Sequence, residues 1–127
     1  MIYKLQSIVA LVLLLIVNSA PVRAVVTLPV GFSQVLVAGG ITAPTTLAAS
    51  PDGRFFIAQQ YGQLRVVKND TLLAQPFMTL SVNIDGERGL LGVAFDPAFT
   101  TNQYVYVCYT VPSGLYNNVS RFTASGD

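Results

Sequence analysis

The sequence predicts an all-β fold, and three observations support this prediction. Beyond an apolar N-terminal segment, few stretches of the 127 residues show the apolar spacing of a helix. Short β-branched and aromatic runs instead alternate with turn sequences, as in a sandwich, a barrel or a propeller. A weak internal repeat then places Pro51 and Pro97 46 residues apart, each after an apolar run and before an alternating strand. A period of about 40–50 residues is typical of a four-stranded propeller blade, so the repeat favours a propeller.

The expected strands follow from these runs. In chain order they are 33–37, 46–49, 55–59, 64–68, 72–73, 77–82, 90–95 and 104–110. Turns rich in Asp, Gly, Asn and Pro separate them, the strongest being Ser50-Pro51-Asp52-Gly53, and residues 123–127 are also expected to form a turn. From the alternation, the side chains expected to be buried are Leu47, Ala49, Phe56, Val66, Leu91, Val93, Phe95 and Val107.

Residues 1–24 are predicted to be a secretory signal peptide. Lys4 precedes an uninterrupted run of ten apolar residues, 8–17, and Val22-Arg23-Ala24 provides a cleavage site after Ala24. A membrane anchor is the alternative, but a spanning helix needs about 20 apolar residues. We therefore expect a secreted or periplasmic protein whose mature part is residues 25–127.

The mature part carries little charge. Two of the seven basic residues, Lys4 and Arg23, precede the cleavage site, which leaves five basic and six acidic residues. This balance excludes a nucleic-acid binder and a basic membrane-binding patch. The single cysteine, Cys108, lies in a strand pattern and is expected to be a buried apolar side chain, because the chain has no histidine to activate a thiol.

The most informative stretch is Gly86 to Phe99, GERGLLGVAFDPAF. It places Glu87 and Arg88 directly before the apolar run 90–95, so both charges are expected at the mouth of a buried strand. Alone, this pattern predicts the start of a strand with a functional rim, and Glu87 and Arg88 are the best candidates to carry chemistry. No metal site is expected, because the aspartates follow no Ca²⁺-loop spacing and stand in turns, where Asp forms local hydrogen bonds. These aspartates are Asp52, Asp70, Asp85 and Asp96.

Three stretches, 43–69, 85–110 and 117–127, resemble the N-terminal part of the glucose/sorbosone dehydrogenase family, the soluble quinoprotein sugar dehydrogenases. The resemblance implies the N-terminal blades of a six-bladed β-propeller. It also implies an enzyme that oxidises the C1 hydroxyl of an aldose, or a related sugar aldehyde, by hydride transfer to pyrroloquinoline quinone near Ca²⁺. The implied partners are a sugar and an electron acceptor.

The resemblance also implies a role for Glu87. In the family, the polar residue before GLLG faces the mouth of the central tunnel, where quinone and sugar meet, and well-characterised members carry an amide there. The resemblance thus implies Glu87 and Arg88 as the cofactor-binding or substrate-binding residues, and Glu87 is not expected to abstract a proton. The family's histidine base, quinone-binding basic residues and calcium ligands lie on later blades. This chain is therefore expected to be an N-terminal fragment with no catalytic residue.

Several alternatives stay open. Glu87 and Arg88 could pair with neighbouring blades and hold the innermost strand. The chain could be a complete small β domain. The longer protein could be a non-catalytic ligand- or protein-binding propeller of the same superfamily, or a metal-dependent lactonase-like propeller. A downstream His followed by Gly, with clustered Arg and Lys, would favour the dehydrogenase. Loss of that His would favour the binding propeller, and a ring of Glu, Asn and Asp ligands would favour the lactonase.

Overall fold

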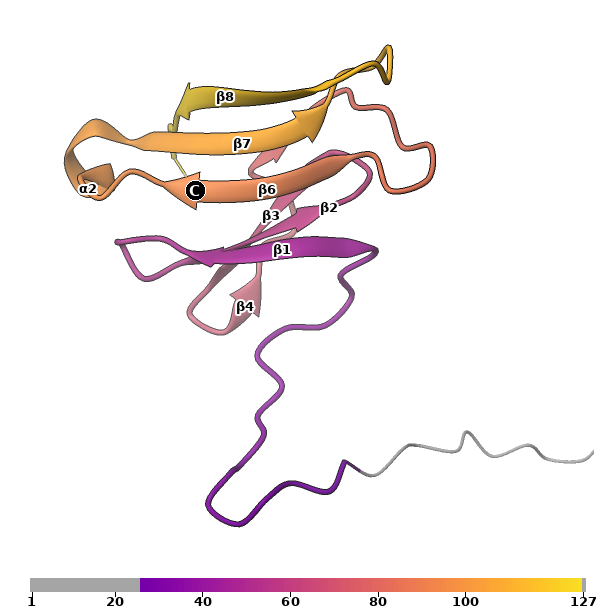
Figure 1. The fold of residues 1–127 in the computed structure, drawn as a ribbon. Coiled ribbons are helices and arrows are strands. Elements are labelled where there is room, and N and C mark those ends of the chain that lie inside the picture. Colours follow the sequence, from indigo (N-terminus) through magenta and orange to yellow (C-terminus); the bar gives the residue numbers. More distant parts are fainter. Residues whose placement is uncertain (1–25, 127) are drawn as a thin grey trace, which may run out of the picture. The chain divides into compact units, whose positions relative to one another are not determined.

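The computed structural model describes residues 26–126, and all of its strands lie between residues 44 and 123 (Figure 1). The predicted signal peptide, 1–24, lies outside the described residues. Residues 26–34 belong to a separate compact unit and contain a turn in which the Phe32 amide donates to the Pro29 carbonyl at 3.1 Å. Among the described residues, no helix is long and apolar enough to cross a membrane.

The first sheet is an antiparallel meander. It consists of β1 (Pro44–Ala49), β2 (Phe55–Gln59) and β3 (Gln63–Lys68), followed by β4 (Thr71–Leu72) and β5 (Met78–Thr79). Both short strands pair with β3, β5 along its first residues and β4 along its last. The outer edge of β3 is thus covered by one interrupted fourth strand, which gives the four-stranded blade that the repeat predicts.

The second sheet is formed by β6 (Leu90–Phe95), β7 (Tyr104–Thr110) and β8 (Asn117–Thr123), again antiparallel and in sequence order. A single helical turn, α2 (Phe99–Asn102), links β6 to β7. We did not predict β8. Its side chains alternate between exposed and only half-buried positions, so its apolar pattern is weak.

The internal repeat corresponds to equivalent strands. β1 and β6 are the first strands of their sheets, and each ends at a turn held by its own polar side chain. After β1 the Ser50 hydroxyl donates to the Arg54 carbonyl at 3.0 Å, and after β6 the Asp96 carboxylate accepts from the Ala98 amide at 2.9 Å. The local chemistry differs, but both side chains provide the hydrogen bond that a tight turn needs.

The hydrophobic core lies between the two sheets. Buried Phe56, Ala58, Leu64 and Val66 of the first sheet belong to the same apolar cluster as Leu90, Val105 and Val107 of the second, with Phe99 of α2. A chain of rings crosses this core, with centroids 5.1 Å apart for Phe77 and Phe56, 4.7 Å for Phe56 and Phe95, and 4.9 Å for Phe95 and Phe99. Such ring pairs each contribute about 0.5–1.5 kcal/mol beyond burial. The two sheets therefore pack face to face.

Two predicted strands differ from the structure. Residues 33–37 form no strand and are exposed, and none of the strands described between residues 44 and 123 pairs with them. The strand expected at 77–82 is reduced to Met78–Thr79, and the chain then enters an irregular loop.

The predicted burial is partly wrong. Phe56, Val66 and Val107 are fully buried, whereas Leu91, Val93, Phe95 and Cys108 are half-buried. Leu47 and Ala49 are exposed, Leu47 by 61%. A register shift between Pro44 and Thr46 precedes them, and the half-buried side chains of β1 are the small ones, Thr46 and Ala48. Small side chains suit the close neighbour β6, so the larger leucine lies on the other face of the strand.

Candidate functional site

The candidate residues Glu87 and Arg88 lie in the irregular loop between β5 and β6, which we call the 80–89 loop. This loop lies at the end of the two sheets where β1 and β6 begin and where β2 and β7 end. Its first part is an Asn-based turn, in which the Asp85 amide donates to the Asn83 side-chain oxygen at 3.0 Å. The loop thus places Glu87 and Arg88 directly before the start of β6.

Gln60, just after β2, fixes the 80–89 loop from the first sheet. Its side-chain amide nitrogen donates to the carbonyl oxygens of Gly86, at 2.8 Å, and Arg88, at 3.0 Å. The backbone carbonyl of Gln60 accepts a hydrogen bond from the Leu90 amide at 3.1 Å. Gly89 has φ of +147°, and a Cβ there would collide with the Gln60 carbonyl oxygen. Glycine is therefore required at this close approach.

Thr110, the last residue of β7, fixes the loop from the second sheet. It is 2% exposed. Its backbone amide donates to the Gly89 carbonyl at 2.8 Å, and its hydroxyl oxygen accepts from the Gly89 amide at 3.3 Å. The hydroxyl in turn donates to the Asn117 side-chain oxygen at 2.7 Å. The 80–89 loop is thus tied to both sheets on either side of Glu87.

Glu87 stands between two open surface hollows. The larger, of about 420 Å³, is lined by Glu87 with Ala43, Pro44, Thr45, Gln60 and Leu91. The smaller, of about 380 Å³, is lined by Glu87 and Leu91 with Arg88, Thr110, Gly114, Leu115, Tyr116 and Asn117. Small-molecule sites typically occupy about 300–1,000 Å³. Each hollow is therefore large enough to take one sugar ring or part of a planar cofactor.

Glu87 and Arg88 do not pair with each other, although they are adjacent in the 80–89 loop. Glu87 is exposed, and within residues 26–126 its carboxylate has neither a hydrogen bond nor an ion pair. Arg88 pairs instead with Asp85, at 3.8 Å between the guanidinium and the carboxylate, and its side chain is 48% exposed. An exposed pair of this kind contributes little stability. Glu87 thus offers a free hydrogen-bond acceptor beside both hollows, held on a fixed backbone.

Sequence reasoning did not identify Gln60, Thr110 or Asn117. All three lie at strand ends on the side of the sheets that carries Glu87: Gln60 follows β2, Thr110 ends β7 and Asn117 begins β8. The sequence could have indicated these residues only by their position, because polar residues at the ends of successive antiparallel strands meet at one end of the sheets. Their chemistry alone did not set them apart from other polar residues at turns.

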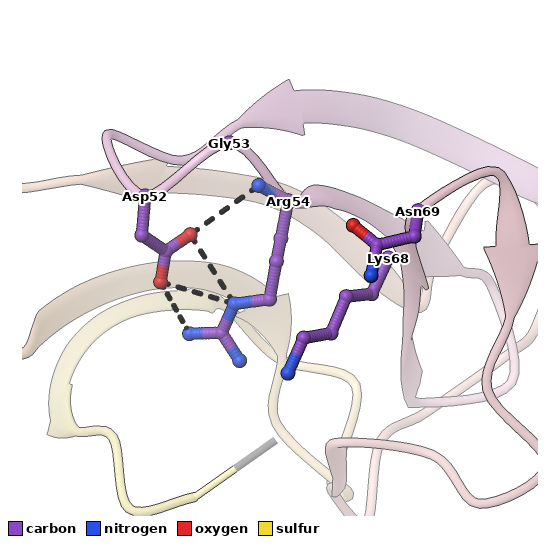
Figure 2. A pocket seen from close by; sticks show the side chains of 5 residues that line it. All are labelled: Asp52, Gly53, Arg54, Lys68 and Asn69. Carbon is purple, nitrogen blue, oxygen red and sulfur yellow. Dashed lines mark hydrogen bonds and ion pairs between the residues drawn. The ribbon is translucent and has the colours of Figure 1, made fainter.

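A third hollow, of about 250 Å³, lies at the opposite end of β1 and β2 (Figure 2). Figure 2 shows the Asp52 carboxylate hydrogen-bonded to Arg54, with Lys68 and Asn69 on the other side of Arg54. The Arg54 guanidinium contacts the Asp52 carboxylate at 2.7 Å and 3.0 Å, also donates to the Gly126 carbonyl, and lies over the Phe56 ring at 5.0 Å. Arg54 is only 7% exposed, so this arrangement is a structural clamp on the turn after β1.

The aspartates considered for a metal site lie in separate turns. Asp52 is bound to Arg54, Asp85 lies near Arg88, and Asp96 accepts hydrogen bonds within its own turn. Across residues 26–126 no group of three or more potential metal ligands comes together.

Comparison with known proteins identifies the family. The sequence profile of the family described as glucose/sorbosone dehydrogenase matches residues 41–127. A solved structure of a protein from Thermus thermophilus, described as a putative oxidoreductase (glucose dehydrogenase), is 41% identical, with a TM-score of 0.64. The match covers 71% of this chain and 27% of that one.

A second similar structure is an aldose sugar dehydrogenase from Streptomyces coelicolor in its PQQ-bound form. It is 27% identical, with a TM-score of 0.62, over 69% of this chain and 26% of that chain. This chain thus spans about a quarter of the length of both solved structures. The similarities and the two packed antiparallel sheets confirm the predicted fold class, all-β blades of a β-propeller. The chain belongs to the glucose/sorbosone dehydrogenase family.

Proposed function

We propose that this chain forms the first two blades of an exported, six-bladed quinoprotein that oxidises the C1 hydroxyl of aldoses or a related sugar aldehyde. Membership of the family and the similarity to a PQQ-bound aldose sugar dehydrogenase support a quinone-dependent sugar dehydrogenase. The activity, the sugar substrate and the electron acceptor belong to the proposal, because the chain covers about a quarter of the similar proteins.

In this proposal Glu87 binds and orients the sugar. An ionised carboxylate only accepts hydrogen bonds, and sugar hydroxyls donate them. Glu87 stands beside both hollows with no partner among the described residues, whereas Gln60 and Thr110 hold the backbone of the nearby Gly86 and Gly89. This single observation, a free acceptor on a fixed backbone between two ligand-sized hollows, supports the assignment most directly.

The described residues do not fit pyrroloquinoline quinone as its complete holder. The quinone carries several carboxylates, and Arg88 is the only positively charged side chain among the described residues that line the two hollows. Residues 26–126 likewise contain no cluster of Ca²⁺ ligands. We therefore propose that these residues form one wall of the site. The quinone, Ca²⁺ and the general base belong to other blades, and the 127 residues contain no histidine to act as base.

Glu87→Gln in the complete protein tests this function. The variant keeps the shape but weakens a charged hydrogen bond, worth about 1.5–3 kcal/mol. We expect kcat/KM for the preferred sugar to fall roughly tenfold to a hundredfold in a dye-linked assay with quinone and Ca²⁺. The melting temperature should hardly change, because the carboxylate has no partner in the described part of the chain.

The matched control is Asp70→Asn. It makes the same carboxylate-to-amide change at an exposed turn with φ of 56°, a conformation that Asn tolerates. Unchanged kinetics with a clear loss of stability in Glu87→Gln would assign Glu87 to structure. Absence of sugar oxidation in the complete wild-type protein, with a retained fold, would favour the non-catalytic binding propeller.

A further inference from the structure

We propose that Gln60 is the positioning residue of this site: it fixes the direction of the Glu87 carboxylate by holding the backbone on both sides of it. The inference rests on the proposed function of Glu87. It adds a residue from a different blade, one that acts through the backbone of the 80–89 loop and not on the sugar.

The first support is the pattern of hydrogen bonds. The Gln60 side-chain nitrogen donates to the carbonyls of the two residues that flank Glu87, Gly86 before it and Arg88 after it. An amide nitrogen has two hydrogens, so both donors are used in these two bonds. One side chain thereby ties the peptide group directly before Glu87 and the peptide group that follows Arg88, and no donor remains on that nitrogen for a ligand.

The second support is the rigidity of Gln60 itself. Its backbone amide donates to the Ala43 carbonyl at 2.9 Å, and its carbonyl accepts from Leu90 at 3.1 Å. Gln60 is thus tied to the chain entering β1 and to the start of β6. Gly89 packs against it so closely that no side chain fits between them. The side-chain amide of Gln60, which holds the 80–89 loop, is therefore attached to a backbone that cannot move without disturbing both sheets.

The third support is the chemistry that this position requires. Two carbonyl oxygens face the side chain, so the residue must supply two donors at the end of a short stem. A carboxylate of the same shape would meet two oxygens of like partial charge and would push the loop away. Gln60→Glu is therefore a nearly isosteric change that reverses the interaction, and Gln60→Ala removes it without repulsion.

The test uses the complete protein with three variants: Gln60→Glu, Gln60→Ala and the control Gln75→Glu. Gln75 is exposed and lies outside the 80–89 loop, so the control reproduces the change of charge alone. Amide hydrogen exchange over residues 86–90 reports the loop directly, without any assay of activity. Steady-state kinetics with the preferred sugar are measured from pH 8 to pH 5.

For both Gln60 variants we expect exchange over 86–90 to rise roughly tenfold and kcat/KM to fall roughly tenfold, mainly through kcat. Gln75→Glu should match the wild type. In Gln60→Glu the activity relative to wild type should recover towards pH 5, because a protonated carboxyl regains one O–H donor. Gln60→Ala should show no such recovery, and a residue with a merely structural role would not produce this difference in pH profile.

The outcomes separate this inference from the proposed function. If exchange over 86–90 is unchanged in both Gln60 variants, the inference is wrong. It is also wrong if exchange rises but kcat/KM stays at the wild-type value in a protein where Glu87→Gln lowers it. If the complete wild-type protein oxidises no sugar, the proposed function fails, and the exchange experiment still decides whether Gln60 positions the loop.

Discussion

At the scale of single residues, Asp52 in the turn after β1 has a strongly lowered pKa. The hydrogen-bonded Arg54 guanidinium, helped by the Ser50 hydroxyl and the Arg54 amide, holds the pKa of Asp52 at about 2, below its ordinary value of 3.8, against the opposing effect of burial. The charged form is therefore favoured in the folded state. Arg54 is buried over Phe56, so this carboxylate provides a charged partner for a guanidinium that is largely removed from water.

Asp52→Asn tests this clamp. A pKa lowered by folding stabilises the protein above the unfolded pKa, and this stability is lost as pH falls through the folded pKa. At pH 7 we expect the variant to lose about 1–2 kcal/mol of unfolding free energy, after allowance for the 30% exposure of the Asp52 side chain. The difference from wild type should shrink by roughly half between pH 6 and pH 3.

The difference between variant and wild type isolates Asp52. The pKa of Asp96 is also lowered, chiefly by the Ala98 amide and then by the Asn102 side chain, but this contribution is common to both proteins. Urea unfolding at several pH values measures the difference, with Asp70→Asn as the control outside the ion pair. A difference that does not change with pH would show that Asp52 acts through shape alone.

At the scale of elements, the 80–89 loop is the junction between the blades. It leaves the first sheet after β5 and enters β6 at Leu90, and it is held by Gln60 on one side and by Thr110 on the other. The Thr45 hydroxyl adds a direct bond from β1 to the Leu90 carbonyl at 2.7 Å. The position of Glu87 is thus set by contacts that only exist once both sheets have formed.

Gly89→Ala tests how tightly this junction is packed. The new Cβ would overlap the Gln60 carbonyl at a backbone conformation that only glycine adopts readily. We expect a loss of at least about 2 kcal/mol in unfolding free energy, from strain and overpacking together. Gly53→Ala is the control, since Gly53 has φ of +88° but nothing within 4 Å of the new Cβ, and it should cost only about 1 kcal/mol.

Denaturant unfolding of the two glycine variants measures this difference. Equal losses would mean that backbone conformation alone explains the need for glycine at both positions. A larger loss in Gly89→Ala would show that the close approach of the 80–89 loop to Gln60 carries the additional cost.

At the scale of the whole molecule, apolar side chains remain exposed on the outer faces of both sheets. Leu47 and Phe55 lie on the first sheet away from the core, 61% and 40% exposed. On the second sheet a hollow of about 230 Å³ is lined by Gly92, Val93, Ala94, Tyr106, Cys108 and Val119. These faces are consistent with the proposed propeller, in which further blades would cover them.

The proposed export is tested by the mature N-terminus. The basic, apolar and cleavage segments of residues 1–24 predict that exported protein begins at Val25. N-terminal sequencing of protein collected from the periplasm or medium provides the measurement, and replacing the small residue at the cleavage site, Ala24→Leu, should block processing. A mature product that retains residues 8–17 would contradict the prediction.

The sequence by itself determined the fold class, most strand positions and the repeat, because β-strand alternation and turn chemistry are local properties. It also placed Glu87 and Arg88 at the mouth of β6, since a charged pair directly before an apolar run is visible in one dimension. Phe56, Val66 and Val107 were predicted to be buried for the same reason, and they are.

Only the tertiary structure decided the rest. Leu47 was assigned to the wrong face because a register shift at the start of β1 and the proximity of β6 fix which side chains face inward. The sequence could not predict the partners of the 80–89 loop either, because Gln60 lies 27 residues before Glu87 and Thr110 lies 23 residues after it. Hydrogen bonds between residues so far apart depend on how two sheets pack, and packing is a property of the folded chain as a whole.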